Sequence, residues 1–365
     1  MTMTGAQEAL VSVIMSVYNT EKFLPVSIQS VLDQTYANLE FIIVNNGSDD
    51  HSLDQIKAFM EKDSRIVLID NKENLFLAEA RNQALDICKG KYVYVVDSDD
   101  SIEPDTVRLA VETAEKNDLD LVVFGWFMEY VLEDRCLSLP VCPAERLFLN
   151  QEDFRLNAAR YLNQSILTVP WNKLYKRANI EKNHIRYRVT KLEDHHFNMD
   201  YIRDVEKVAF IPNPLYHYFR SRSSSELNSV YHFHLFQKKK EHYLHTKEIF
   251  TYWQLKDASS WSILYTFFAE RIVQCIQEIV ANESFSAKEK KKAIAEILKD
   301  EDAREAIRKA KPDGLMKIMV LPLKWRWKFL CIAEARFINR YRERNREKYI
   351  RIQAKQVNQA KEKAL

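Results

Sequence analysis

The sequence predicts an α/β fold, in which a doubly wound sheet is followed by a mainly α-helical carboxyl-terminal region. Short apolar runs alternate with amphipathic segments over roughly the first 125 residues, which is the pattern of strands connected by helices. Residues 126–230 are aromatic and irregular, and we expect them to complete the same domain. From Tyr231 onward the apolar spacing is helical. We therefore expect one domain over residues 1–230 and a helical domain over residues 231–365.

The alternation begins with the apolar run Leu10–Val17, which predicts a buried parallel strand. The segment Phe23–Gln34 then places Leu24 and Ile28 on one helical face. In the carboxyl-terminal region, Ser286–Lys309 predicts one charged helix rich in Ala, Glu and Lys. Between these segments the predicted elements are strands at 39–44, 66–69, 91–96 and 119–124 and helices at 53–59, 78–88 and 106–115.

Composition excludes several classes of protein. Only five glycines occur, and no two of them are spaced to form the Rossmann dinucleotide fingerprint or a P-loop. The five cysteines are scattered and form no C-x-x-C, so a disulfide framework or cysteine metal cluster is not expected. No signal peptide and no run of 18 apolar residues is visible. These features predict a cytoplasmic protein.

Polar clusters follow three of the predicted strands. Tyr18-Asn19, Asn45-Asn46 and the acidic turn Asp97–Asp100 each stand where a strand ends. In a doubly wound sheet the ligand binds at the carboxyl ends of the strands, so these clusters predict one binding site. Carboxylates at such a position suit Mg²⁺ or Mn²⁺ held together with substrate phosphates.

The acidic turn contains the sequence Asp97-Ser98-Asp99, a D-x-D, which is a weak signal by itself. Two other D-x-D sequences occur, Asp118-Leu119-Asp120 and Asp300-Glu301-Asp302, and neither follows a predicted strand. A solvated turn or helix surface is the ordinary explanation of such a motif. The position of Asp97–Asp100 after an apolar strand distinguishes it, because charge beside a buried strand end is costly unless it is compensated.

An ordered series of motifs resembles the family 2 glycosyltransferases of bacterial polysaccharide, teichoic-acid and glycoprotein glycan assembly. The resemblance covers about residues 11–225 and implies the GT-A fold, a Rossmann-like mixed sheet with a nucleotide-sugar half to about residue 115 and an acceptor half to about residue 230. The motifs are VIMSVYN (13–19), SVLDQTY (30–36), EFIIVNNGSDD (40–50), NLFLAEARN (74–82), KGK (89–91), DSDD (97–100), WNKLY (171–175) and Glu193-Asp194 within KLEDHHF.

The resemblance also implies roles for single residues. Asp97 and Ser98 would lie near the ribose and sugar, and Asp99 would bind the divalent metal, Mn²⁺ or Mg²⁺. Asp194 would be the general base that takes a proton from the acceptor hydroxyl, so that a single displacement inverts the anomeric configuration. The uridine and diphosphate of a UDP-sugar would be lined by Tyr18, Glu21, Asn46, Asn74 and Arg81.

The sequence departs from the family pattern at three positions. Ser16 stands where Pro is usual, Asn46 where Asp is frequent, and Phe76 where Gly is usual. The stretch YHYFRSRSSS (216–225) is similar to a Tyr- and Arg-rich family segment, with a register ambiguous by one residue. It makes Arg220 and Arg222 candidates for diphosphate contact and His217 a candidate for diphosphate contact or metal ligation. His195 and His196 are expected to be packing residues.

The carboxyl-terminal tail is basic. Residues 311–365 carry fifteen Lys or Arg and five Asp or Glu, whereas the remainder of the chain is acidic. Leu321–Phe337 interleaves aromatic and basic residues, which is typical of a helix lying in the plane of a membrane surface. A helix packed on the catalytic domain is an equal alternative. Nucleic-acid binding is the weakest of the three explanations of the tail, because no recognised nucleic-acid-binding motif accompanies the charge.

The sequence therefore predicts an inverting, metal-dependent transferase that moves a hexose from a UDP-sugar to a hydroxyl of a glycan acceptor. That acceptor is a surface polysaccharide, a lipid-linked glycan or a glycan on a protein. Two alternatives stay open: a nucleotidyl- or phosphotransferase with the same metal carboxylates, and a non-catalytic binding subunit of the same fold. Neither the sugar nor the oligomeric state is predicted.

Overall fold

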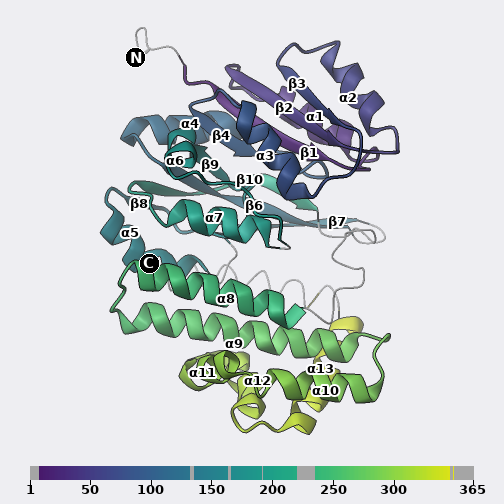
Figure 1. Cartoon of the computed structure of the whole chain (residues 1–365), viewed down its shortest axis with the longest axis vertical. Helices are drawn as coiled ribbons and strands as arrows, with labels where there is room; N and C mark the ends of the chain where they lie inside the picture. The colour runs from purple at the N-terminus through teal and green to yellow at the C-terminus, as the bar shows by residue number, and fades with distance from the viewer. Residues whose placement is uncertain are drawn as a thin grey trace. The chain divides into compact units, whose positions relative to one another are not determined.

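The computed structural model describes residues 8–131, 135–162, 166–190, 192–219, 235–345 and 348 (Figure 1). These residues divide into two compact units. The first contains the described chain up to Phe154 and again from Ile166 to Phe219. The second contains residues 155–162 and the chain from Leu235 onward. A short stretch near residue 160 therefore belongs with the carboxyl-terminal helices.

A mixed sheet forms the centre of the first unit and has ten strands within the described residues. Along the sheet the order is β3-β2-β1-β4-β9-β6-β10-β5, with β7 on β6 and β8 on β10. The strands are β1 (Val11–Val17), β2 (Leu39–Asn46), β3 (Ile66–Asn71), β4 (Tyr92–Val95), β5 (Ser101–Ile102), β6 (Leu121–Val131), β7 (Cys136–Val141), β8 (Arg146–Phe148), β9 (Lys173–Lys176) and β10 (Val208–Phe219).

The two halves of the sheet are built differently. Strands β3, β2, β1 and β4 are all parallel, as the apolar runs predict. Strand β9 is antiparallel to both β4 and β6, and β7 and β8 also pair in antiparallel fashion. The expectation of an irregular segment at 126–230 was therefore wrong, because this segment supplies most of β6 and all of β7 to β10. The strand signal of this segment is weak, because β7 contains a proline and exposes every second residue, and β9 contains two lysines.

Helices connect the strands of the first unit. The helix after β1 begins with Leu24-Pro25, where a proline at the first turn is preorganised for a helix. Its buried residues Leu24, Ile28 and Val31 follow helical spacing, and the helix after β3 contacts β1 and β2. The helices are α1 (Leu24–Leu32), α2 (Ser52–Met60), α3 (Leu77–Ile87), α4 (Thr106–Asn117), α5 (Gln151–Ala158), α6 (Arg177–Lys182) and α7 (Glu193–Ile202).

In the second unit α9 is the central helix and contacts the other five that lie within the described residues (Figure 1). Its buried stripe includes Leu264, Phe268, Ile272 and Ile276, which follow helical spacing. The helices are α8 (Leu235–Tyr252), α9 (Ala258–Ala281), α10 (Ala287–Ile297), α11 (Glu301–Lys309), α12 (Gly314–Lys324) and α13 (Lys328–Arg344). No helix within the described ranges is both long and apolar enough to cross a membrane.

The charged segment 286–309 forms two helices, so the expectation of a single helix was wrong. Ser286 begins α10 through a capping box with Glu289. Asp300 begins α11, because its carboxylate accepts the backbone N–H of Ala303 at 3.0 Å. The same observation explains the third D-x-D sequence, in which Asp300 is a helix cap and also pairs with Lys240 at 2.7 Å.

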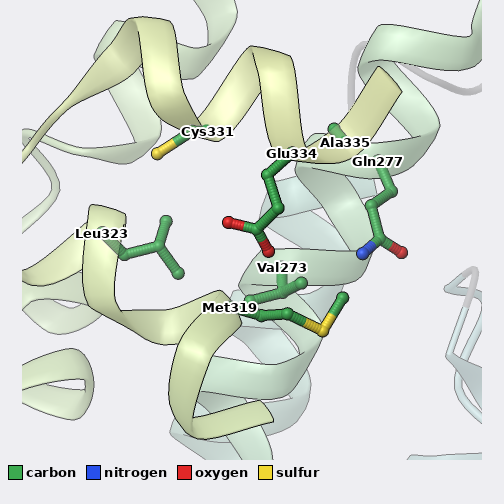
Figure 2. Close-up of a pocket in the computed structure, with 7 residues that line it drawn as sticks. All are labelled: Val273, Gln277, Met319, Leu323, Cys331, Glu334 and Ala335. Atoms are coloured by element: carbon green, nitrogen blue, oxygen red, sulfur yellow. The ribbon is translucent and has the colours of Figure 1, made fainter. Parts of the chain in front are cut away.

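A small pocket lies between α9, α12 and α13, and Figure 2 shows the carboxylate of Glu334 directed toward it. Burial among Val273, Met319 and Leu323 raises the pKa of Glu334 to about 7. The folded state therefore binds this proton more tightly than the unfolded state does. The contribution of Glu334 to the free energy of unfolding is present at acidic pH and is lost as the pH rises from about 4.5 to about 7.

Replacing Glu334 by Gln should remove this pH dependence. We expect the variant to match the natural protein in thermal midpoint at pH 5 and to exceed it at pH 8. At pH 8 the buried Glu334 carboxyl of the natural protein is ionised at a cost, whereas the amide of the variant stays neutral. Thermal unfolding at both pH values measures the difference. Glu343→Gln, on the exposed surface of α13, is the matched control. Equal midpoints for Glu334→Gln and the natural protein at pH 8 would contradict the burial of this carboxylate.

Gly47 positions the loop that follows β2. Its φ is +72°, and a Cβ atom there would lie 2.3 Å from the carbonyl carbon of Glu73. Only glycine combines the left-handed conformation with so close an approach. The turn after β2 is thereby packed against the loop that leads into α3, and both line the same edge of the sheet.

Candidate active site

The loops after β1, β2 and β4 are tied together at the carboxyl edge of the parallel strands. The side-chain carbonyl of Asn19 accepts the backbone N–H of Asp49 at 3.0 Å, and Ser48 Oγ accepts the backbone N–H of Asn19 at 3.2 Å. Thr20 Oγ1 donates to Ser98 Oγ at 3.2 Å. The three polar clusters that the sequence places at strand ends therefore lie at one edge of the sheet.

Tyr18 and Glu21 occupy the first of these loops. The Tyr18 side chain is 40% exposed, so its ring can meet a ligand. The Glu21 backbone N–H donates to Asp50 at 3.0 Å, and its carboxylate accepts the backbone N–H of His51 at 3.0 Å. Glu21 thus helps to fix the start of α2 beside the strand-end loops.

Asn46 is held entirely by protein groups. Its Nδ2 donates to the side chain of Asn74 at 3.0 Å and to the carbonyl of Leu75 at 2.6 Å. Its Oδ1 accepts from the Leu75 backbone and from Asn71, each at 3.2 Å. The expected uridine contact of Asn46 stays a prediction, and it would need one of these bonds to be exchanged. In the structure the side chain anchors the loop that carries Asn74.

The acidic turn after β4 contains carboxylates in different environments. Asp97 accepts a hydrogen bond from Arg81 at 2.8 Å, and burial raises its pKa to about 6, although Arg81 opposes that rise. Asp100 is buried, and it accepts the hydroxyl of Tyr216 at 2.8 Å and the backbone N–H of Phe219 at 3.0 Å. Asp100 therefore joins this turn to β10. Asp99, the residue before it, is half-buried.

The D-x-D at 118–120 has a structural explanation. Asp118 adopts a left-handed conformation with φ of 47° at the end of α4, a conformation that Asp tolerates better than most residues. Its carboxylate pairs with Lys176 at 2.7 Å. Asp120 accepts the backbone N–H groups of Glu206 and Lys207 at 2.9 and 3.2 Å. Both carboxylates therefore have structural roles, Asp118 in an ion pair and Asp120 in hydrogen bonds to the backbone.

Arg81 joins the two halves of the site. Its side chain is only 3% exposed, one terminal nitrogen donates to Asp97, and the other donates to Asp194. Burial disfavours the cation, but the two carboxylates outweigh burial and hold the pKa of Arg81 well above its usual value. Both terminal nitrogens bond to protein carboxylates. The expected contact of Arg81 with a diphosphate stays a prediction, and in the structure the residue bridges the two carboxylates.

Asp194 lies in the first turn of α7, and the WNKLY stretch holds that helix. Tyr175 of β9 donates its hydroxyl proton to Asn198 at 2.7 Å, and Asn198 donates to the carbonyl of Asp194 at 2.7 Å. The buried side-chain nitrogen of Lys173 donates to the Ile166 carbonyl at 2.6 Å and to Asn172 Oδ1 at 2.7 Å. The motif thereby positions the carboxylate of Asp194 against Arg81.

Comparison with known proteins places the chain in a family. The model of Glycosyl transferase family 2 matches residues 12–182. An uncharacterized glycosyltransferase of Haemophilus influenzae is 31% identical over 198 residues, which cover 54% of this chain and 74% of that protein. The chain belongs to glycosyl transferase family 2.

This family 2 chain is also similar to two further bacterial proteins. The putative glycosyltransferase EpsH of Bacillus subtilis is 31% identical over 57% of this chain, and the chain spans 60% of that relative's length. A crystal structure of S. aureus TarS residues 1–349 in complex with UDP-GlcNAc superposes with a TM-score of 0.66 at 18% identity, covering 91% of each chain. The expected GT-A sheet followed by a helical region is confirmed.

Tyr187 is a site residue of this glycosyltransferase that the sequence analysis missed. The Arg81 guanidinium carbon lies 5.1 Å from the centre of its ring. The Tyr187 ring also stacks on the ring of Phe197 in α7, with the two ring centres 4.1 Å apart. Asn82 exchanges two hydrogen bonds of 2.8 Å with the backbone of Tyr187. Asn82 belongs to a motif that the sequence shows, but its pairing with Tyr187, 105 residues further along the chain, could not be predicted from the sequence.

His217 is engaged by two carboxylates. One ring nitrogen lies 2.8 Å from Glu129 and the other 2.7 Å from Glu103, and the ring stacks on Phe127 at 4.9 Å. A metal could bind His217 only if one of these carboxylates moved. Within the described part of the chain, no three His, Cys, Asp or Glu side chains form a metal-binding group.

The remaining predicted residues divide into two groups. His195 and His196 are buried on α7, at 3% and 5% exposure, as expected of packing residues. Arg220 and Arg222 lie outside the described residues.

Two substitutions of Tyr187 should separate its ring from its hydroxyl. The hydroxyl is buried and has no hydrogen-bond partner among the described residues, so Tyr187→Phe should keep turnover within about twofold. Tyr187→Leu removes the ring under Arg81 and should lower kcat by roughly five- to thirtyfold, the kinetic equivalent of a desolvated cation–π contact. Equal losses in kcat for both variants, at unchanged donor KM, would contradict this positioning role.

Proposed function

We propose that this chain transfers a hexose from a UDP-sugar to a hydroxyl of a glycan acceptor, with inversion at the anomeric carbon. The observation that carries the proposal is the Arg81 bridge, which joins Asp97 of the nucleotide half to Asp194 on α7. Such a bridge holds a carboxylate base beside the edge where a donor would bind. Inversion requires this geometry, because base and leaving group lie on opposite sides of the anomeric carbon.

The donor would occupy the edge formed by the loops after β1, β2 and β4. Tyr18 and Glu21 in the first loop and Asn74 in the loop before α3 would line the nucleotide, with Ser98 near the ribose. The similar fold of TarS, which binds UDP-GlcNAc in its crystal structure, supports a uridine nucleotide. Because Asn46 stands where Asp is frequent in the family, donors with thymidine or guanosine should be tested beside those with uridine.

A divalent cation would bind at Asp99. Asp99 is half-buried in the acidic turn that follows β4, and the family resemblance assigns metal binding to this position. One protein carboxylate with substrate phosphates and water is the usual way in which Mg²⁺ is bound. When bound, such a cation would neutralise charge that develops on the departing diphosphate. His217 stays a proposal as a second ligand.

Asp194 would act on the acceptor. As the acceptor oxygen attacks the anomeric carbon, its proton passes to the Asp194 carboxylate and the bond from that carbon to the diphosphate oxygen breaks. Arg81 holds the Asp194 carboxylate in place through the hydrogen bond that it donates. The acceptor is a lipid-linked glycan, a polysaccharide or a glycan on a protein. All five cysteines are free, which goes with a cytoplasmic location.

A nucleotide-binding screen tests the donor assignment. Thermal unfolding would be followed with UDP, dTDP and GDP, each with Mn²⁺ and with chelator. The proposal predicts that UDP with Mn²⁺ raises the midpoint most, because a ligand that binds only the folded state stabilises it. A larger shift with GDP or dTDP would overturn the uridine assignment. No shift with any nucleotide would favour the non-catalytic alternative.

A further inference from the structure

The second unit carries a concentrated apolar surface on α12, α13 and the turn between them. Twenty-one large apolar side chains are exposed among the described residues, and eight of these lie within positions 315–337. Single exposed apolar residues are normal, but a contiguous group on a protein surface marks an interaction site. We call the exposed side chains of residues 315–337 the apolar–basic surface.

Helix α12 is apolar on both sides. Met319, Val320 and Leu323 are buried toward the unit. On the outer side Leu315, Ile318 and Leu321 are 61%, 65% and 50% exposed. The exposed residues of α12 also include Lys317 and Lys324, but three large apolar side chains exposed on one short helix exceed the single exposed residues that are normal on a protein surface. The outer side of α12 therefore has the character of an interaction surface.

The turn between the helices holds two tryptophans outward. Trp325 and Trp327 are 64% and 52% exposed and stack at 6.1 Å. Between them Arg326 has a φ of +55°, a conformation that costs free energy for a residue with a side chain. The backbone N–H of Trp327 donates to the Pro322 carbonyl at 2.9 Å. The turn is thus fixed with both indole rings on the surface.

Helix α13 continues the apolar–basic surface. Cys331 and Ala335 are buried, and Phe329 and Phe337, two helical turns apart, are 73% and 71% exposed. Basic side chains are interleaved with them. Residues 311–345 contain nine Lys or Arg and only three Asp or Glu, and Lys317, Lys324 and Arg336 are exposed.

We propose that the apolar–basic surface docks this protein on an anionic lipid bilayer. Tryptophan and phenylalanine are suited to the boundary between headgroups and acyl chains, and each Lys or Arg near that surface adds electrostatic attraction to anionic lipid. A second copy of the chain fits poorly, because a symmetric contact would bring two strongly basic surfaces together. A nucleic acid would leave the exposed apolar side chains in water. This binding goes beyond the transferase reaction and needs no donor.

Vesicle co-sedimentation of the full chain tests the proposal. The lipids are phosphatidylcholine alone and phosphatidylcholine with phosphatidylglycerol, at low and at high salt. We expect at least tenfold stronger partitioning to the anionic vesicles, weakened by salt. The apolar variant Trp325→Ser/Phe329→Ser/Phe337→Ser and the basic variant Lys317→Gln/Lys324→Gln/Arg336→Gln should each lose at least tenfold.

Two control variants separate this surface from general effects. Lys256→Gln/Lys299→Gln/Arg304→Gln removes the same charge from exposed basic side chains outside α12 and α13 in the second unit, and Leu147→Ser/Leu149→Ser removes exposed apolar groups from the first unit. Both should bind vesicles within twofold of the natural protein. Thermal unfolding checks that every variant is folded. Blue-shifted tryptophan emission on anionic vesicles, lost in the apolar variant, would report insertion directly.

Three results would overturn the proposal. The first is equal partitioning of the natural protein and the apolar variant. The second is a dimer in sedimentation velocity that the apolar variant abolishes, without vesicle binding by the natural protein. The third is binding to RNA that is as tight as binding to anionic vesicles and unaffected by the apolar variant. None of these depends on donor turnover, so they are distinguishable from a failure of the transferase assignment.

Discussion

Replacing Asp194 by Asn should lower turnover by about 10²- to 10⁴-fold, the usual contribution of a general base. The amide oxygen can still accept the hydrogen bond from Arg81, so the bridge and the fold should survive. It cannot take a proton from the acceptor hydroxyl. UDP affinity should therefore stay within a few-fold of the natural protein. Steady-state release of UDP in the presence of acceptor, with nucleotide titration by calorimetry, measures both quantities.

Asp86→Asn provides the control for the loss of a carboxylate. Asp86 lies at the end of α3 and forms an exposed pair with Arg186 at 3.0 Å, so its loss should leave turnover unchanged. Turnover of Asp194→Asn within threefold of the natural protein would mean that another group takes the proton. Loss of UDP binding in that variant would instead mean that Asp194 shapes the donor site.

Replacing Arg81 by Met should destabilise the first unit by about 1–3 kcal/mol and abolish turnover. Two carboxylates lose their partner, but Asp97 and Asp194 are 30% and 36% exposed, so water screens part of the loss. Arg81→Lys keeps the charge but lacks the fork that reaches both carboxylates, so it should recover only part of the stability. Denaturant unfolding in parallel with UDP release measures the two effects.

A triple variant makes the Arg81 prediction sharper. Combining Arg81→Met with Asp97→Asn and Asp194→Asn removes every charge of the bridge, and most of the lost stability should return, because neutral polar groups are far less costly to bury than unpaired charges. Turnover should not return. If the single Arg81→Met variant is as stable as the natural protein, the bridge as described is wrong. Arg108→Met is the control, because Arg108 is half-buried on α4 and also pairs with two carboxylates, those of Asp105 and Glu112, at the surface.

The parallel half of the fold could be predicted from the sequence because its signals are local. Strands β1 and β2 are continuous apolar runs, and polar turns separate them from helices. The antiparallel half could not be predicted in this way. In β9, Lys173 is fully buried and held by carbonyl groups from the preceding loop, so a lysine that indicates a surface position lies in the core. The long-range pairings that enforce this are not visible locally.

The candidate site shows the same division. The positions of Asp97, Asp99 and Asp194 in motifs identified them from the sequence. The sequence could not show that Arg81 would bond to two carboxylates, because Asp194 is 113 residues away from it in the chain. Tyr187 belongs to no motif, and its role follows from ring contacts with Arg81 and Phe197. The split of helix 286–309 depended on Asp300, whose capping role could have been recognised from its position before an acidic first turn.

Metal-dependent release of UDP tests the central assignment most directly. The purified chain would be incubated with a panel of UDP-hexoses, with Mn²⁺ and with chelator, beside Asp99→Asn. The account predicts slow UDP release from one donor with Mn²⁺, none with chelator, and at least a hundredfold loss in Asp99→Asn while Asp86→Asn stays active. Release of hexose 1-phosphate would indicate nucleotidyl transfer, and release of UMP would indicate transfer of the phosphosugar. Full activity of Asp99→Asn, or activity unaffected by chelator, would contradict the account.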